Sequence, residues 1–395
     1  MADIESKAKL YNYAQNSLGN EISEQKNIHD FINGVLMLAI GKNASDIHFE
    51  ALEDSLIIRI RVDGLLVQVF RFESSFYSFI SSVIKVVANL DISQKRLPQN
   101  SRFSRYINGV NYDFRVSTMP TILGESIVIR ILNLQNITPR LEELGFNEKN
   151  LNLIRKGMAS KQGMILVTGP TGSGKTTTLY SILKKLNLLN RKIITIEDPV
   201  EYKMNNIQQI NINNDIGLTY GEALKNVLRQ DPDILLIGEI RDRYSLQIAI
   251  QAALTGHLVL ATLHTKDALN SINRLLDLEA EPFLISATLK TLISQRLIRK
   301  LCPVCKEKSV NEKGEPFTSK GCEKCNLSGY NGRELISEVI EVDDTLASMV
   351  SQKSSMEEMS KYCMERGYKT LKEDGMKKVE SGISTKEELY CTIGV

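Results

Sequence analysis

The sequence predicts an α/β protein with a parallel-rich sheet, preceded by a smaller α+β domain. Three observations lead to this fold class. Apolar strand-like runs alternate with helical segments after residue 138, whereas one helical segment and several strand-like runs precede it. Two pairs of cysteines also lie in a short segment near the C-terminus. Alternating strands and helices are typical of a mostly parallel sheet that helices cover.

Composition narrows the function classes. The chain has 395 residues, 42% apolar and 24% charged, which is typical of a globular protein of two or three domains. Its net charge of +2 argues against nucleic-acid binding through bulk charge. The start "MADIESKAKLYNYAQ" is no secretory signal, and the longest apolar runs are too short to span a bilayer. We therefore expect a cytoplasmic protein, and association with a membrane through a partner stays open.

The first domain is predicted over residues 27–138, after a polar tail at 1–26. A helical pattern of apolar residues runs from Ile28 to Gly41. Strand-like runs follow, and Asp63-Gly64 and Asn108-Gly109 are two-residue hairpin signals between them. The last strand-like run, "SIVIRIL", ends at residue 132.

The second domain is predicted over residues 139–395. Its expected strands are "GMILVTG", "KIITIED", "DILLIGEI" and "HLVLATLH", with helical segments between them. It includes a cysteine-rich segment at 300–327 and a polar, helical C-terminal part at 341–395.

The strongest motif is "GPTGSGKT", which follows the strand "MILVT" and begins a helix. Its glycines let backbone N–H groups surround phosphate oxygens at the N-terminus of that helix. We expect Lys175 to contact the β- and γ-phosphates of ATP, and the Thr176 hydroxyl to bind Mg²⁺. The predicted nucleotide-binding residues are Gly169, Pro170, Thr171, Gly172, Ser173, Gly174, Lys175, Thr176 and Thr177.

Two acidic motifs follow predicted strands. In "TIEDPVEY", Glu197 leads three carboxylates at a strand end, where the edge of a parallel sheet faces a nucleotide. Glu197 would hold Mg²⁺ through water or orient the attacking water; the alternative is a solvated acidic loop. In "DPDILLIGEIRD", Glu239 ends a buried strand in a Walker-B arrangement. We expect Glu239 to polarise water or bind Mg²⁺, with a merely solvated carboxylate as the alternative.

Two of the four histidines flank the next strand, "LVLATL". His264, at its C-terminal end, is expected to point toward the γ-phosphate and to report hydrolysis. His257, at its start, is farther from the nucleotide and is either structural or at an interface.

The cysteine pairs "CPVC" and "CEKC" are separated by sixteen residues. This spacing is typical of a tetrahedral Zn²⁺ site whose four thiolates leave no position for water, so the metal would be structural. The predicted ligands are Cys302, Cys305, Cys322 and Cys325, and four unmetallated thiols are the alternative.

Arginines recur on the strands of the first domain, at Arg102, Arg115 and Arg130. Surface arginines usually pair with acids or are solvated. In a two-domain ATPase, however, an arginine on one domain often stabilises the phosphates held by the other.

Together these motifs resemble the secretion ATPase superfamily of type II secretion and type IV pilus biogenesis. The resemblance covers residues from about 28 to the end. It includes "ASDIHFE", "RVDGLL", "GPTGSGKTTTLY", "TIEDPVEY", "LRQDPDILLIGEIRD", "TGHLVLATLHT" and "QRLIRKLCPVC". The chain departs from the family pattern at "RDRYSL", "QNSR" and "TLHTK".

The resemblance implies a PAS-like first domain, a RecA-like second domain and a hexamer that holds ATP between the domains. It also implies that Glu239 is the catalytic glutamate and that Arg102 and Arg115 face the γ-phosphate. The cysteine segment is similar to that of assembly rather than retraction ATPases.

The expected function is a cytoplasmic Mg-ATPase motor for a pseudopilus, a pilus or a DNA-uptake filament. It would act at the inner membrane on a platform protein, without direct contact to nucleic acid. The alternatives are an ATP-binding regulatory module with little hydrolysis, and a nucleic-acid translocase.

Overall fold

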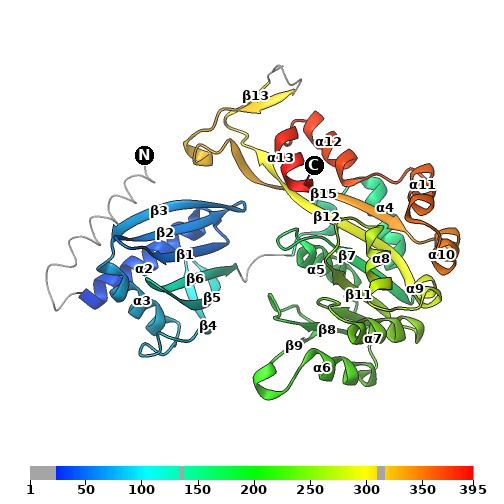
Figure 1. The fold of residues 1–395 in the computed structure, drawn as a ribbon, viewed down its shortest axis with the longest axis horizontal. Helices are drawn as coiled ribbons and strands as arrows, with labels where there is room; N and C mark the ends of the chain where they lie inside the picture. The colour runs from blue at the N-terminus through cyan, green and yellow to red at the C-terminus, as the bar shows by residue number, and fades with distance from the viewer. Residues whose placement is uncertain (1–23, 134–137, 309–315, 395) are drawn as a thin grey trace. The chain divides into compact units, whose positions relative to one another are not determined.

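The computed structural model describes residues 24–133, 138–308 and 316–394 (Figure 1). The chain forms two compact units, Met1–Asn136 and Ile137–Val395. Most of the predicted tail (1–23) and part of the predicted zinc segment (309–315) lie outside the described residues. Within the described residues, no helix has the length and apolar character needed to cross a bilayer.

An antiparallel sheet forms the first unit. Its strands are β1 (Asp46–Ala51), β2 (Ser55–Val62), β3 (Leu65–Glu73), β4 (Gln99–Ile107), β5 (Val110–Thr121) and β6 (Gly124–Asn133). Their spatial order is β3-β2-β1-β6-β5-β4. Both predicted hairpin turns are present, with positive φ at Asp63-Gly64 and Asn108-Gly109, as two-residue turns of this kind require.

Two helices, α2 (Glu24–Gly41) and α3 (Phe76–Val87), pack on one face of this sheet. Phe31 and Leu36 of α2 share a core with Ile80 and Ile84 of α3 and with alternate residues of every strand. The expectation of a single helix was wrong, since α3 is a second one, and α2 begins at Glu24, before the predicted Ile28. Because both helices lie on the same face, the other face of the sheet carries the polar alternate residues.

A seven-stranded mixed sheet forms the second unit, and most of its strands are parallel. They are β7 (Gly163–Thr168), β8 (Ile193–Glu197), β9 (Gln208–Asn211), β10 (Ile234–Ile237), β11 (Leu258–Leu263), β12 (Leu289–Leu301) and β15 (Tyr330–Glu341). Their order is β15-β12-β7-β11-β10-β8-β9, and only β15 runs antiparallel to its neighbour. The predicted α/β class is therefore confirmed for this unit.

Helices cover both faces of the mixed sheet (Figure 1). Met164 and Leu166 of β7 belong to one apolar core, and Ile165 and Val167 belong to the other. The helices are α4 (Glu148–Met158), α5 (Lys175–Leu186), α6 (Tyr220–Val227), α7 (Arg243–Leu254), α8 (Asn270–Asp277), α9 (Pro282–Thr288), α10 (Asp344–Ser351), α11 (Met356–Glu365), α12 (Leu371–Glu380) and α13 (Lys386–Ile393). Continuous burial on both faces explains why the central strands β7, β10 and β11 consist almost entirely of apolar residues.

The long hairpin of β12 and β15 was not predicted from the sequence. It extends the sheet beyond β7, and its two strands pair from Thr291–Glu341 to Leu301–Tyr330. The cysteine segment connects the two strands and includes a small ribbon of β13 (Lys306–Lys308) and β14 (Phe317–Ser319). The helical nature of the C-terminal part agrees with the prediction, since α10 to α13 follow β15.

Candidate active site

Strand register brings the chemical motifs to one edge of the mixed sheet. Leu263 pairs with Thr168, so His264 follows β11 where the glycine loop follows β7. Ile237 pairs with Ala261 on one side and with Ile196 on the other, so Glu239 lies between His264 and the end of β8. The carboxyl ends of parallel strands are the usual ligand-binding edge of such a sheet.

The glycine loop turns from β7 into α5. Gly174 precedes the helix with φ of 86°, in the left-handed region that favours glycine. A Cβ atom on Gly169 would lie 2.6 Å from the carbonyl oxygen of Gln295. The chain therefore needs glycine at both ends of the loop, and the backbone N–H groups at the start of α5 are available to bind anions.

Lys175 folds back over this loop. Its ammonium group donates to the carbonyl oxygens of Gly169 (2.8 Å) and Pro170 (3.0 Å). Burial, followed by the positive charge of Arg296, lowers the pKa of Lys175 to about 8. Thr176 and Thr177 are exposed on the first turn of α5, whereas Ser173 is buried. A partly desolvated cation on a loop of N–H donors is suited to phosphate.

Glu239 lies beside a base and a cation. One carboxylate oxygen contacts Nε of Arg241, and the other lies 3.5 Å from Nε2 of His264. Burial, then the charges of Lys175 and Arg241, lower the pKa of His264, which favours the neutral form of the imidazole. A carboxylate and a neutral imidazole at this edge are groups that can orient or deprotonate water.

Glu197 reaches the same edge but turns into the interior. Its side chain accepts hydrogen bonds from the hydroxyl groups of Tyr180 and Thr195, the latter at 2.6 Å, and from Gln209 at 3.4 Å. Only 4% of the residue is exposed, and burial raises the pKa of its carboxyl group. Glu197 thus ties α5 to β8 and β9, and its part in catalysis stays a prediction.

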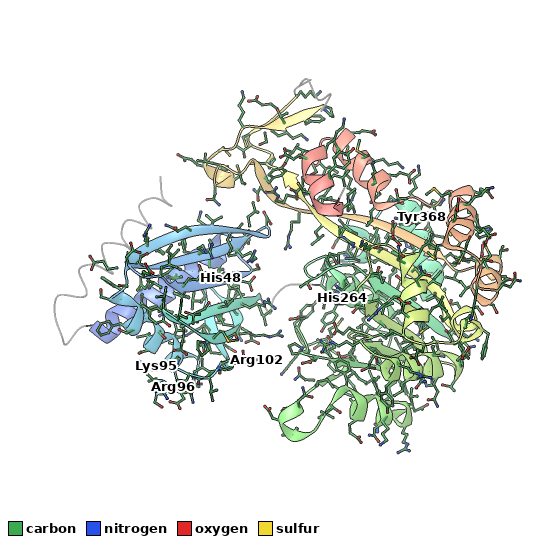
Figure 2. The ribbon with its side chains drawn as sticks, viewed as in Figure 1. His48, Lys95, Arg96, Arg102, His264 and Tyr368 are labelled. Carbon is green, nitrogen blue, oxygen red and sulfur yellow. The ribbon has the colours of Figure 1, made fainter. Side chains whose placement is uncertain are left out.

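His257 lies at the opposite edge of the sheet, before β11 begins. Its Nδ1 lies 2.9 Å from the carbonyl oxygen of Ala252 and 3.1 Å from the Thr255 hydroxyl, at the C-terminal end of α7. These contacts are local to that helix end. These contacts are those of a structural residue, and a role of His257 at an interface stays a prediction. His264, labelled in Figure 2, follows β11 at the edge where the glycine loop follows β7.

The arginines of the first unit form a row on the polar face of its sheet. Arg102 pairs with Arg115, which pairs with Arg130, which pairs with Asp46 and then Arg61 across five neighbouring strands. Nε of Arg130 lies 3.0 Å from the Asp46 carboxylate. Directly opposed residues point to the same face of a sheet, so this face concentrates positive charge. Arg102 is exposed on β4 (Figure 2).

Gln295 and Arg296 of β12 belong to the site, although they were not among the predicted site residues. The fully buried Gln295 donates to the carbonyl oxygen of Ser173 at 2.7 Å and accepts from the Thr178 hydroxyl at 2.8 Å. Arg296 donates to the carbonyl oxygen of Lys266 at 2.6 Å. Only β12 beside β7 brings these side chains to the loop, so the contact depends on tertiary structure.

The four predicted cysteines lie together at the tip of the β12–β15 hairpin. All four Sγ atoms lie within 4.8 Å of one another, and three of their separations are 3.7, 3.8 and 3.9 Å. Tetrahedral zinc with Zn–S bonds of about 2.3 Å requires sulfur separations of about 3.8 Å. The N–H groups of Cys322 and Gly329 also point at Sγ of Cys325. These residues fit a four-thiolate zinc site.

Comparison with known sequences gives matches over nearly the whole chain. The profile of a family described as Type II/IV secretion system protein matches residues 21–391. Type II secretion system protein E of Pseudomonas aeruginosa is 43% identical over 371 residues, which cover 91% of this chain and 74% of the relative. Type IV pilus assembly ATPase PilB of Myxococcus xanthus is 43% identical over 375 residues, covering 91% of this chain and 66% of the relative.

Solved structures have the same fold. The Legionella pneumophila ATPase DotB superposes with a TM-score of 0.70 at 22% identity, covering 92% of this chain and 95% of DotB. The pilus retraction motor PilT, crystallised with bound ADP, has a TM-score of 0.65 at 27% identity. That match covers 90% of this chain and 94% of PilT.

Proposed function

Because this chain belongs to the family of type II/IV secretion system proteins, we propose that it is a hexameric Mg-ATPase motor for filament assembly. The filament is a type II secretion pseudopilus, a type IV pilus or a DNA-uptake filament. The convergence of the glycine loop, Lys175, Glu239 and His264 at one sheet edge is the observation that carries the proposal. The chain is an ATPase, and its identity to an assembly ATPase exceeds that to the retraction motor PilT.

ATP would bind on the loop from Gly169 to Thr177, and the similar motor PilT has bound ADP in its crystal structure. Lys175 would leave the carbonyl oxygens of Gly169 and Pro170 to pair with the β- and γ-phosphates. Thr176 and Glu239 would hold Mg²⁺, with Glu239 also polarising the attacking water. His264 would sense the γ-phosphate, while Arg102 and Arg115 would supply positive charge to it.

Zinc would be structural in this protein. We propose Cys302, Cys305, Cys322 and Cys325 as its ligands, because their sulfur separations match a tetrahedral site. Four thiolates leave no coordination position for water, so the ion would hold the tip of the hairpin together rather than react.

The domain and partner proposals follow from the family. Residues 27–138 would be a PAS-like domain and residues 139–395 a RecA-like domain. The protein would work in the cytoplasm, associated peripherally with the inner membrane through a platform protein. We propose that the protein works without direct contact with nucleic acid.

The proposal is tested by steady-state ATP hydrolysis by wild type and the Glu239→Gln variant. We expect the variant to lose activity by about 100-fold or more, since a positioned general base contributes about 10²–10⁴ in rate. Affinity for a non-hydrolysable ATP analogue should change little. Glu222→Gln, an exposed substitution on α6, is the matched control. Equal hydrolysis by wild type and Glu239→Gln would instead indicate a regulatory module, and stimulation by DNA would indicate a translocase.

A further inference from the structure

The segment that follows His264 is fastened at two points by the β12–β15 hairpin. Arg296 of β12 donates to the carbonyl oxygen of Lys266 at 2.6 Å. Glu338 of β15 accepts a hydrogen bond from the backbone N–H of Ala268 at 2.5 Å. The loop from His264 to Ala268 therefore takes its position from two side chains of the hairpin.

Glu338 also reaches the C-terminal helices. Its second carboxylate oxygen accepts from the N–H of Leu371 at 3.0 Å, at the start of α12. The hydroxyl of Tyr368, which precedes α12 (Figure 2), bonds to the same carboxylate. Only 2% of Glu338 is exposed. A single buried carboxylate thus joins the His264 loop to a turn about a hundred residues later in the sequence.

We propose that Glu338 is a positioning residue for ATP hydrolysis, which holds the loop carrying His264 and links it to the Tyr368–Leu371 turn. This inference rests on the proposed role of His264. A change at the γ-phosphate that moves His264 would pull on Ala268 and, through Glu338, on the start of α12. The same link would transmit a displacement of the C-terminal helices to the catalytic edge.

The hydrogen bonds that join the His264 loop to the start of α12 depend on the charge of Glu338. Both oxygens receive donors when the carboxylate is ionised, whereas protonation places an O–H group against an N–H donor. Burial raises the pKa of Glu338 to about 7, against the opposing hydrogen bonds of Ala268, Tyr368 and Leu371. The nearby Asp267 also raises the pKa of Glu338, and the charge of Arg296 lies close to its carboxylate. The population of molecules in which ionised Glu338 bonds to both Ala268 and Leu371 therefore increases as pH rises from 6 to 8.

The test compares kcat and KM for MgATP in full-length Glu338→Gln, Tyr368→Phe and Asp374→Asn between pH 6 and 8. The amide of Glu338→Gln can accept from only one of its two backbone partners, so kcat should fall about tenfold with KM within about twofold. We expect kcat of wild type to rise with pH over this range, and Glu338→Gln should lose that rise. Tyr368→Phe removes a donor that lowers the pKa of Glu338, so the rise should move to higher pH.

Asp374→Asn is the matched control. Asp374 of α12 is 3% exposed and accepts from the N–H of Ser337 on β15 and from the side chain of Asn147, so it joins α12 to β15 and to the start of α4 through bonds that do not involve the His264 loop. It should lower thermal stability while leaving kcat and its pH profile unchanged. If Glu338→Gln fails to fold, the pH profile of kcat in Tyr368→Phe tests the positioning role of Glu338.

Two results would overturn the inference: equal losses of kcat in Glu338→Gln and Asp374→Asn, or an unmoved pH profile in Tyr368→Phe. His264→Ala separates this inference from the proposed function. If His264→Ala lowers kcat and Glu338→Gln does not, the positioning role alone fails. If His264→Ala has no effect on kcat, the proposed role of His264 fails with it.

Discussion

Gln295 provides the sharpest test of how β12 shapes the nucleotide loop. The Gln295→Met substitution keeps the length of the side chain but removes both hydrogen bonds of its amide. The carbonyl oxygen of Ser173 and the hydroxyl of Thr178 would then lose their partner in the interior. An unpaired buried polar group costs about 1–3 kcal/mol. We therefore expect the free energy of unfolding to fall by about 2–4 kcal/mol, because the loop relaxes part of the loss.

Nucleotide affinity shows whether Gln295 holds the loop in its binding conformation or only stabilises the fold. If Gln295 holds the loop in its binding conformation, Gln295→Met should weaken binding of an ATP analogue by about tenfold, equal to about 1.4 kcal/mol. Urea unfolding and calorimetric titration measure the two effects. Asn150→Leu is the control, because buried Asn150 bonds to Ser337 at 3.1 and 3.3 Å, in contact with β15 rather than the loop. Equal affinity in wild type and Gln295→Met would refute the reasoning.

Three further predictions concern single groups. Lys175, with a pKa of about 8, is half neutral at pH 8, and phosphate would raise its pKa; MgATP binding should therefore take up about half a proton at pH 8 and almost none at pH 6.5, as calorimetry in two buffers measures. Cys325→Ser should abolish stoichiometric zinc in the purified protein and lower its melting temperature by several degrees, and zinc retained at one ion per chain would contradict the proposed ligand set. His257→Ala should lower the free energy of unfolding by about 1 kcal/mol and leave kcat unchanged, so a tenfold loss of kcat would show that the C-terminal end of α7 contributes to catalysis.

Residues close together in the sequence allowed much of the site to be predicted. The glycine loop, Glu239 and His264 each follow a strand directly, and parallel register brings strand ends together. The spacing of the two cysteine pairs likewise predicted that their four thiol groups lie together. In contrast, Gln295 contacts Ser173 only because β12 pairs with β7, and nothing in the spacing of the two residues indicates this.

The errors in predicting the fold have similar causes. The segment of α3 is rich in β-branched and aromatic residues, which favour strands, yet its buried residues Ile80 and Ile84 have helical spacing. The strand β12 is buried at every position from Thr291 to Gln295, and its charged residues Lys290, Arg296, Arg299 and Lys300 do not alternate with apolar ones, so no single period identifies the strand. The direction of the Glu197 side chain could not be predicted either, because Tyr180 and Thr195 supply donors that draw its carboxylate inward; its expected part in catalysis stays a prediction. Side-chain direction at a strand end depends on such partners.

The row of Arg102, Arg115, Arg130 and Arg61, interrupted by Asp46, has an electrostatic consequence for the first sheet. Neighbouring strands lie about 4.8 Å apart, a distance at which like charges repel. A multivalent anion that binds this face would reduce the repulsion between the neighbouring guanidinium groups. Sulfate or phosphate in a purification buffer should therefore raise the melting temperature of this protein more than chloride at equal ionic strength.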